Sequence, residues 1–126
     1  MRPINVVLAR RDPALTDNLV RSISKRFHNI ATANNAEEVR AAVARQRAEL
    51  AIVDLEVVNF SELSQLCHEF PATAFVSTHR LADDAMWSQS LSMGAVDCCF
   101  AGDMPKILQA SERYVAIKQA QTPTAA

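Results

Sequence analysis

Asp54 is the residue best placed to do chemistry in this 126-residue chain, because it closes the short apolar run Leu50–Val53. A carboxylate at the carboxyl end of a buried strand lies at the sheet edge where ligands gather in α/β folds. Such a carboxylate can accept a phosphoryl group or contribute to a magnesium site. The run Ile4–Ala9, which should lie beside it, ends in Arg10 and Arg11. This edge therefore presents cations where a metal-dependent phosphoryl acceptor needs more carboxylates.

The two arginines bear directly on metal binding. Magnesium requires near-octahedral oxygen ligands, and proteins usually supply one or two carboxylates. Guanidinium groups repel the ion, although they can replace part of its charge because arginine forms paired bonds with carboxylate and phosphate. Glu56 in the following loop is one further acid, and Asp12 stands before Pro13, where it is expected to cap a helix. The sequence therefore predicts no cofactor and no metal ligands at Asp54.

Each candidate residue also has a purely structural interpretation. Asp54 paired with Arg10 or Arg11 is as well explained by a structural ion pair as by a regulatory site. Ser77 closes another apolar run, and a hydroxyl at a strand end commonly bonds to backbone. Trp87 lies on an expected helix with both apolar and polar neighbours, which predicts a side chain that is partly core and partly exposed.

The elements that must position these residues alternate along the chain. Apolar runs bounded by turn residues predict strands, and capped segments with apolar side chains three or four residues apart predict helices. The expected strands cover residues 4–9, 29–33, 50–54, 73–77 and 96–100, and the expected helices cover 12–27, 35–47, 61–70, 82–93 and 103–118. Five strands alternating with five helices predict a doubly wound α/β fold with a parallel sheet and right-handed crossovers.

The chain resembles the receiver domains of two-component response regulators over residues 3–118. The resemblance rests on the order of strands and helices, on Asp54, and on the sequence from Phe75 to Thr78. It implies a flavodoxin-like (βα)5 fold with five parallel strands in the order 2-1-3-4-5. By this resemblance Asp54 matches the phosphoacceptor of the family, and Ser77 matches the hydroxyl residue at the end of strand four.

Five positions depart from the family's pattern. In that family strand one ends in two acids, and strand five ends in a lysine that is followed by proline and preceded, three residues earlier, by an aromatic switch residue. The corresponding positions hold Arg10, Arg11, Ala101, Gly102 and Cys98. Function transfers with residues and not with a fold alone. These departures predict a degenerate, pseudo-receiver-like domain.

Composition limits the remaining classes of function. Thirteen lysines and arginines against fourteen acids give a formal net charge of −1 without a basic block, which argues against nucleic acid as a partner. No apolar run is long enough to span a membrane, so a cytoplasmic location is expected. Cys67, Cys98 and Cys99 lack disulfide or zinc spacing and are expected to be buried thiols. One domain over residues 1–118 and a flexible tail or linker over 119–126 complete the prediction.

We expect a signalling domain that is not an enzyme, has no catalytic residue and acts through protein contact without magnesium-dependent phosphorylation. The predicted contact face comprises the helix at 82–93, the strand at 96–100 and the last helix, with Trp87 and Tyr114 as anchors. The partner would be a second copy or another protein, such as a histidine kinase or an output domain. Two alternatives remain: a phosphorelay receiver in which Arg10 and Arg11 replace the metal at Asp54, and a module in which these arginines sense a small anion.

Overall fold

Five parallel strands form one sheet in the order β2-β1-β3-β4-β5, which confirms the predicted topology. The computed structural model describes residues 4–11, 17, 20, 21, 27 and 29–121. The elements are β1 (Asn5–Ala9), β2 (Asn29–Thr32), α2 (Ala36–Gln46), β3 (Leu50–Asp54), α3 (Phe60–Glu69), β4 (Ala74–His79), α4 (Asp84–Met93), β5 (Asp97–Phe100) and α5 (Met104–Gln121). The expected helix at residues 12–27 lies mostly outside the described residues.

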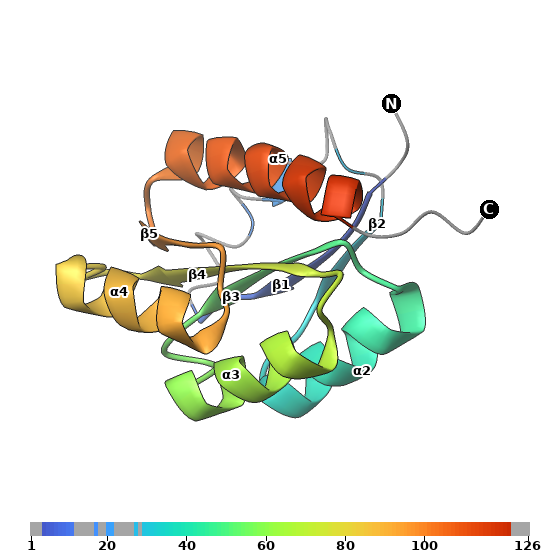
Figure 1. The fold of residues 1–126 in the computed structure, drawn as a ribbon, viewed down its shortest axis with the longest axis horizontal. Helices are drawn as coiled ribbons and strands as arrows, with labels where there is room; N and C mark the ends of the chain where they lie inside the picture. Colours follow the sequence, from blue (N-terminus) through green and yellow to red (C-terminus); the bar gives the residue numbers. More distant parts are fainter. Residues whose placement is uncertain (1–3, 12–16, 18–19, 22–26, 28, 122–126) are drawn as a thin grey trace.

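Helices cover both faces of the sheet, so the molecule has three layers (Figure 1). Successive residues of a strand point to opposite faces, and the two cores follow this alternation. Val7, Val53 and Phe75 pack with α2 and α3, whereas Leu8 and Ile52 pack with α5. All five residues of β3 are buried, as a central strand covered on both faces requires.

Local capping signals in the sequence fix several helix boundaries. Asn35 accepts a hydrogen bond from the Glu38 amide at the start of α2, and Asn59 forms a reciprocal capping box with Glu62 at the start of α3. At the end of α4, Gly94 adopts the left-handed backbone conformation with φ of 109°. These caps explain why the expected helices and the observed ones agree within a few residues.

The start of the predicted tail at residue 119 falls inside a helix. α5 continues through Gln121, and residues 122–126 lie outside the described part of the chain. Helix four also begins later than expected, at Asp84, because Asp83 serves as its N-cap.

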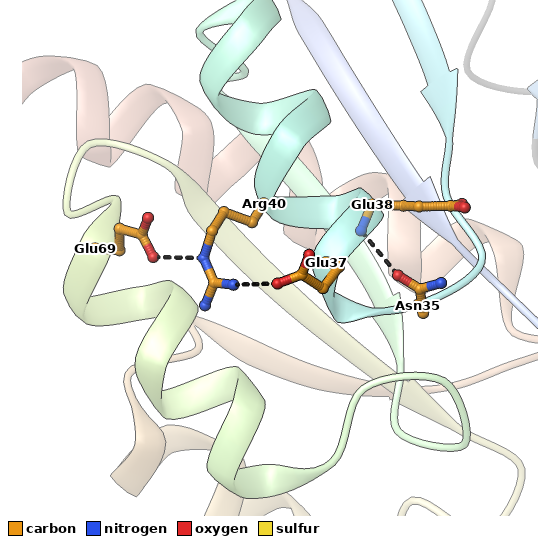
Figure 2. Close-up of polar contacts among 5 residues, drawn as sticks. All are labelled: Asn35, Glu37, Glu38, Arg40 and Glu69. Atoms are coloured by element: carbon orange, nitrogen blue, oxygen red, sulfur yellow. Dashed lines mark hydrogen bonds and ion pairs between the residues drawn. The ribbon is translucent and has the colours of Figure 1, made fainter.

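An exposed ion-pair network joins α2 to α3 (Figure 2). Arg40 Nε donates to Glu69 Oε2 at 2.7 Å, and Arg40 Nη1 lies 3.4 Å from Glu37 Oε1. The Glu69 carboxylate raises the pKa of Arg40 above its ordinary value. Because these side chains are largely exposed to solvent, the network contributes little to the stability of the fold.

Candidate functional site

The carboxyl edge of the sheet carries a row of polar side chains on the face that α5 covers. The strand registers pair Ala9 with Val53, Asp54 with Thr78, and Thr78 with Cys99. Arg10 follows Ala9 directly and so continues the register opposite Asp54. Residues in register on adjacent parallel strands share one face of the sheet. Arg10, Asp54, Thr78 and Cys99 therefore form one row across four strands.

Asp54 is buried, with 6% of its surface exposed, and it organises the loop that follows β3. Its Oδ1 accepts the Glu56 amide at 2.9 Å. Its backbone carbonyl accepts the amides of Val57 and Val58 at 2.9 and 3.0 Å. The carboxylate at the predicted phosphoacceptor position thus already acts as a structural acceptor.

Arg10 is also buried, with 7% of its surface exposed, and it extends across the edge of the sheet. Its Nη2 donates to the carbonyl oxygen of Ala101 at 2.5 Å. Since β3 and β4 lie between β1 and β5 in the sheet, the guanidinium reaches past the ends of both strands. The resemblance expects a lysine at Ala101, on the far strand. In this protein a fixed cation instead comes from β1 and binds the backbone at that position.

Arg11, unlike Arg10, points toward solvent. Its side chain is 70% exposed, and Nη1 lies 3.6 Å from Glu56 Oε2. Arg80 Nε lies 2.9 Å from Glu56 Oε1, and His79 Nε2 lies 3.8 Å from the same oxygen. The Glu56 carboxylate therefore lies close to basic side chains from three positions around the mouth of the sheet, and it forms ion pairs with Arg11 and Arg80.

The two hydroxyl residues at the end of β4 face opposite sides of the sheet. Ser77, the residue that the resemblance selects, is fully buried; its Oγ lies 2.9 Å from Ser90 Oγ and 3.3 Å from the Asp97 carbonyl oxygen. It thereby ties α4 to the sheet. Thr78 is the hydroxyl in register with Asp54, and its buried Oγ1 has no hydrogen-bond partner in the described part of the chain. Alternation along β4 places Ser77 and Thr78 on opposite faces, and only the pairing of β3 with β4 shows that Thr78 shares the face of Asp54.

The described residues at this mouth do not fit magnesium, the ion that the resemblance to receiver domains implies. A magnesium ion needs near-octahedral oxygen ligands and retains several waters. Asp54 is buried in the same row as the Arg10 guanidinium, and Glu56 is paired with Arg80. Within residues 4–11 and 29–121, no group of three or more His, Cys, Asp and Glu side chains is arranged to hold a metal ion.

The predicted contact face is partly apolar and hollowed. Trp87 on α4 is 47% exposed, and its Nε1 donates to Asp97 Oδ1 at 3.2 Å. Phe100 at the end of β5 is 48% exposed and was not anticipated from sequence. A groove of about 570 Å³ is lined by Ala82, Asp83, Asp84, Trp87, Cys98, Phe100 and Lys106. Cys98, at the position of the family's switch residue, is thus a buried side chain in this groove.

Tyr114, the second predicted anchor of the contact face, is partly buried. Tyr114 packs against the core on the α5 side and stacks under Arg113, whose guanidinium carbon lies 5.5 Å from the ring centre. It is therefore only partly available as an anchor.

All three thiols are free; Cys98 and Cys99 are buried as expected, whereas Cys67 is partly exposed. Burial, followed by the nearby Asp97 charge, raises the pKa of Cys99 to about 12.

Comparisons with solved structures define the fold. The receiver domain protein (CheY-like) from Methanospirillum hungatei is 15% identical, with a TM-score of 0.81 over 96% of this chain and 100% of that one. A response regulator from Burkholderia pseudomallei, solved with a phosphorylated aspartic acid, calcium and citrate, is 21% identical, with a TM-score of 0.76 over 94% and 72%. NtrX from Brucella abortus is 15% identical, with a TM-score of 0.83; the match covers 95% of this chain but only 28% of the NtrX chain.

The chain thus has the fold of response-regulator receiver domains. No protein-family model and no curated protein matches its sequence. None of the helices in the described part of the chain is long and apolar enough to cross a membrane.

Proposed function

We propose that this chain is a receiver-like signalling domain that acts through protein contact without magnesium-dependent phosphorylation of Asp54. The observation that carries the proposal is the buried Arg10 side chain, which reaches from β1 to the Ala101 carbonyl oxygen. A metal ion at Asp54 would have to enter against this positive charge. The expected class is a binding module in a signalling pathway and not an enzyme.

The Arg10 contact also supplies a constant charge where a switch would need a variable one. Phosphoryl transfer depends on cations that neutralise charge on the transferred group, and a conformational response requires a ligand that favours one state over another. Unlike a metal ion or a phosphoryl group, the Arg10 side chain cannot bind and leave. Its charge therefore always favours the same arrangement of β1, Asp54 and the end of β5. A single resting arrangement is the expected result.

The contact face is held in place by bonds that do not involve Asp54. Ser77 contacts Ser90 from β4, and Trp87 donates to Asp97 at the start of β5. Both bonds attach α4 to the sheet. We therefore expect the surface of α4, β5 and α5 to be constitutively available to a second copy, a histidine kinase, an output domain or another protein.

Incubation with magnesium and a small phosphodonor such as acetyl phosphate, followed by intact mass measurement, tests the proposal. We expect no gain of a phosphoryl group in the wild type, because Arg10 opposes the metal and Ala101 supplies no amine. The triple variant Arg10→Asp, Arg11→Asp, Ala101→Lys should recover magnesium binding. A stoichiometric, magnesium-dependent gain in the wild type that disappears in Asp54→Asn would overturn the proposal.

Thr78 supports a second candidate function, the binding of a small oxyanion. Its buried hydroxyl lacks a hydrogen-bond partner among the described residues, and it shares a row with the Arg10 cation. An oxyanion can accept bonds from both kinds of donor. Phosphate and sulfate should then raise the melting temperature of the wild type more than that of Thr78→Val. Equal shifts in the two proteins would exclude this site.

A further inference from the structure

The groove beside α4 combines aromatic rings with carboxylates. Trp87 and Phe100 line it with about half of each side chain exposed. Trp87 is held at its Nε1 by Asp97, so the ring has a fixed orientation while much of its surface remains open. Large exposed aromatic side chains that share one hollow favour a bound partner. The groove therefore offers an open aromatic surface in which one edge of the Trp87 ring is held by a hydrogen bond.

The charges around this groove are mostly negative. Asp83 and Asp84 line it at the start of α4, and Lys106 on α5 is the only cation among its described lining residues. Asp97 adds a further carboxylate, which accepts the hydrogen bond from Trp87 Nε1. One oxygen of Asp83 accepts the Met86 amide at 2.9 Å, which leaves its other oxygen available. An apolar partner would cover these carboxylates without pairing them, at a cost in desolvation.

We infer that the groove receives an arginine side chain from a partner protein, an inference that rests on the proposed contact function of this face. Guanidinium groups lie flat against aromatic rings and form paired hydrogen bonds with carboxylates. The groove supplies both partners, with Trp87 and Phe100 as the aromatic surface and Asp83 and Asp84 as the acceptors. Its volume of about 570 Å³ exceeds the space that one arginine side chain needs, so flanking residues of the partner also fit.

The single tryptophan of the chain gives a direct measurement. In ¹⁵N-labelled protein the Trp87 indole N–H gives one resolved signal, which can be followed during titration with N-acetyl-arginine methylamide. We expect a saturable shift of this signal. The matched control probe is the citrulline analogue, which has nearly the same shape but no charge and should give a much weaker response. Equal responses to the two probes, or no response to arginine, would overturn the inference.

Charge variants locate the binding. The double variant Asp83→Asn, Asp84→Asn removes both charges, and asparagine remains a good N-cap, so α4 should be retained. We expect roughly a 2- to 5-fold loss of affinity for each charge removed, and a gain in affinity for Lys106→Gln. The same two variants should leave the melting temperature nearly unchanged. Unaltered affinity in the double variant would contradict the inference.

Two further outcomes separate this inference from the function on which it rests. A phosphoryl gain on Asp54 with magnesium would overturn the proposed function whatever the titration shows. If phosphorylation is absent and the arginine probe does not bind, only the assignment of the groove fails. If the Trp87 signal instead changes with protein concentration, and arginine does not reverse that change, the groove accommodates a second copy and the inference is wrong.

Discussion

Arg10 and Asp54 place opposite charges at buried positions in one row of the sheet, and each is bonded to backbone. Arg10 donates to the Ala101 carbonyl, while Asp54 accepts the Glu56 amide. Buried charges are tolerated when such bonds and an opposite charge compensate their desolvation. At the scale of single residues, the site therefore consists of a buried cation and a buried carboxylate, each bonded to backbone, with the Thr78 hydroxyl in the same row.

Asp54→Ala should destabilise the fold by about 1–3 kcal/mol, because it removes the acceptor of the Glu56 amide and leaves the buried Arg10 charge less compensated. Asp54→Asn is the matched control, since it retains an oxygen acceptor and removes only the charge. In chemical denaturation, the free energy of unfolding should be highest for the wild type, lower for Asp54→Asn and lowest for Asp54→Ala. An alanine variant as stable as the wild type would show that the carboxylate contributes nothing to the fold.

Among the elements, α4 is the one whose attachment matters for the proposed contact function. Ser90 and Trp87 bond it to β4 and β5, and Gly94 ends it in a left-handed turn. This turn brings the backbone close to α3, so that a Cβ atom at Gly94 would lie 2.7 Å from Cys67 Cβ. The position of α4, and with it the proposed contact face, thus depends on a close approach that glycine alone allows.

Gly94→Ala should cost more than about 1 kcal/mol in unfolding free energy, because the backbone is unfavourable for alanine and the new methyl group meets Cys67. Gly102→Ala provides the control, since no atom apart from those of Gly102 and its two chain neighbours lies within 4 Å of a Cβ placed there. That variant should change stability by less than about 0.5 kcal/mol. Thermal or chemical denaturation of both proteins makes the comparison, and equal effects would refute the explanation.

For the whole molecule, β5 connects the mouth of the sheet to the proposed contact face. The Ala101 carbonyl after its carboxyl end receives Arg10, while Cys98 and Phe100 line the groove on the contact face. Between them lies Cys99, buried in the core that α5 covers. The stability of this strand therefore affects the mouth of the sheet and the groove together.

Alkaline pH should lower the stability of the protein through ionisation of the Cys99 thiol on β5. Its pKa rises from 9.0 to about 12 on folding, so the protonated thiol contributes stability below about pH 9 that is lost as the pH approaches 12. In this window the free energy of unfolding should fall by about 1.4 kcal/mol per pH unit from this group alone. Cys99→Ala should give a shallower slope in denaturation experiments from pH 8 to 11. Equal slopes would show that the thiol ionises as readily when folded.

Strand and helix order followed from local signals, because apolar runs, Asn35, Asn59 and Gly94 act over a few residues. Asp54 could be placed at the sheet edge for the same reason, and the presence of Arg10 and Arg11 at the end of β1 was readable directly. The expected exposure of part of Trp87 is confirmed at 47%. The sequence by itself therefore determined the fold and the composition of the mouth.

The tertiary structure decided which of these residues meet. The choice between Ser77 and Thr78 depends on strand register, because a shift of one residue reverses the face. The destination of Arg10 depends on a partner 91 residues away, brought close only by the assembled sheet. Phe100 joins Trp87 in a groove for the same reason. Local patterns specify elements, whereas contacts between distant segments exist only once the sheet and its helices have packed.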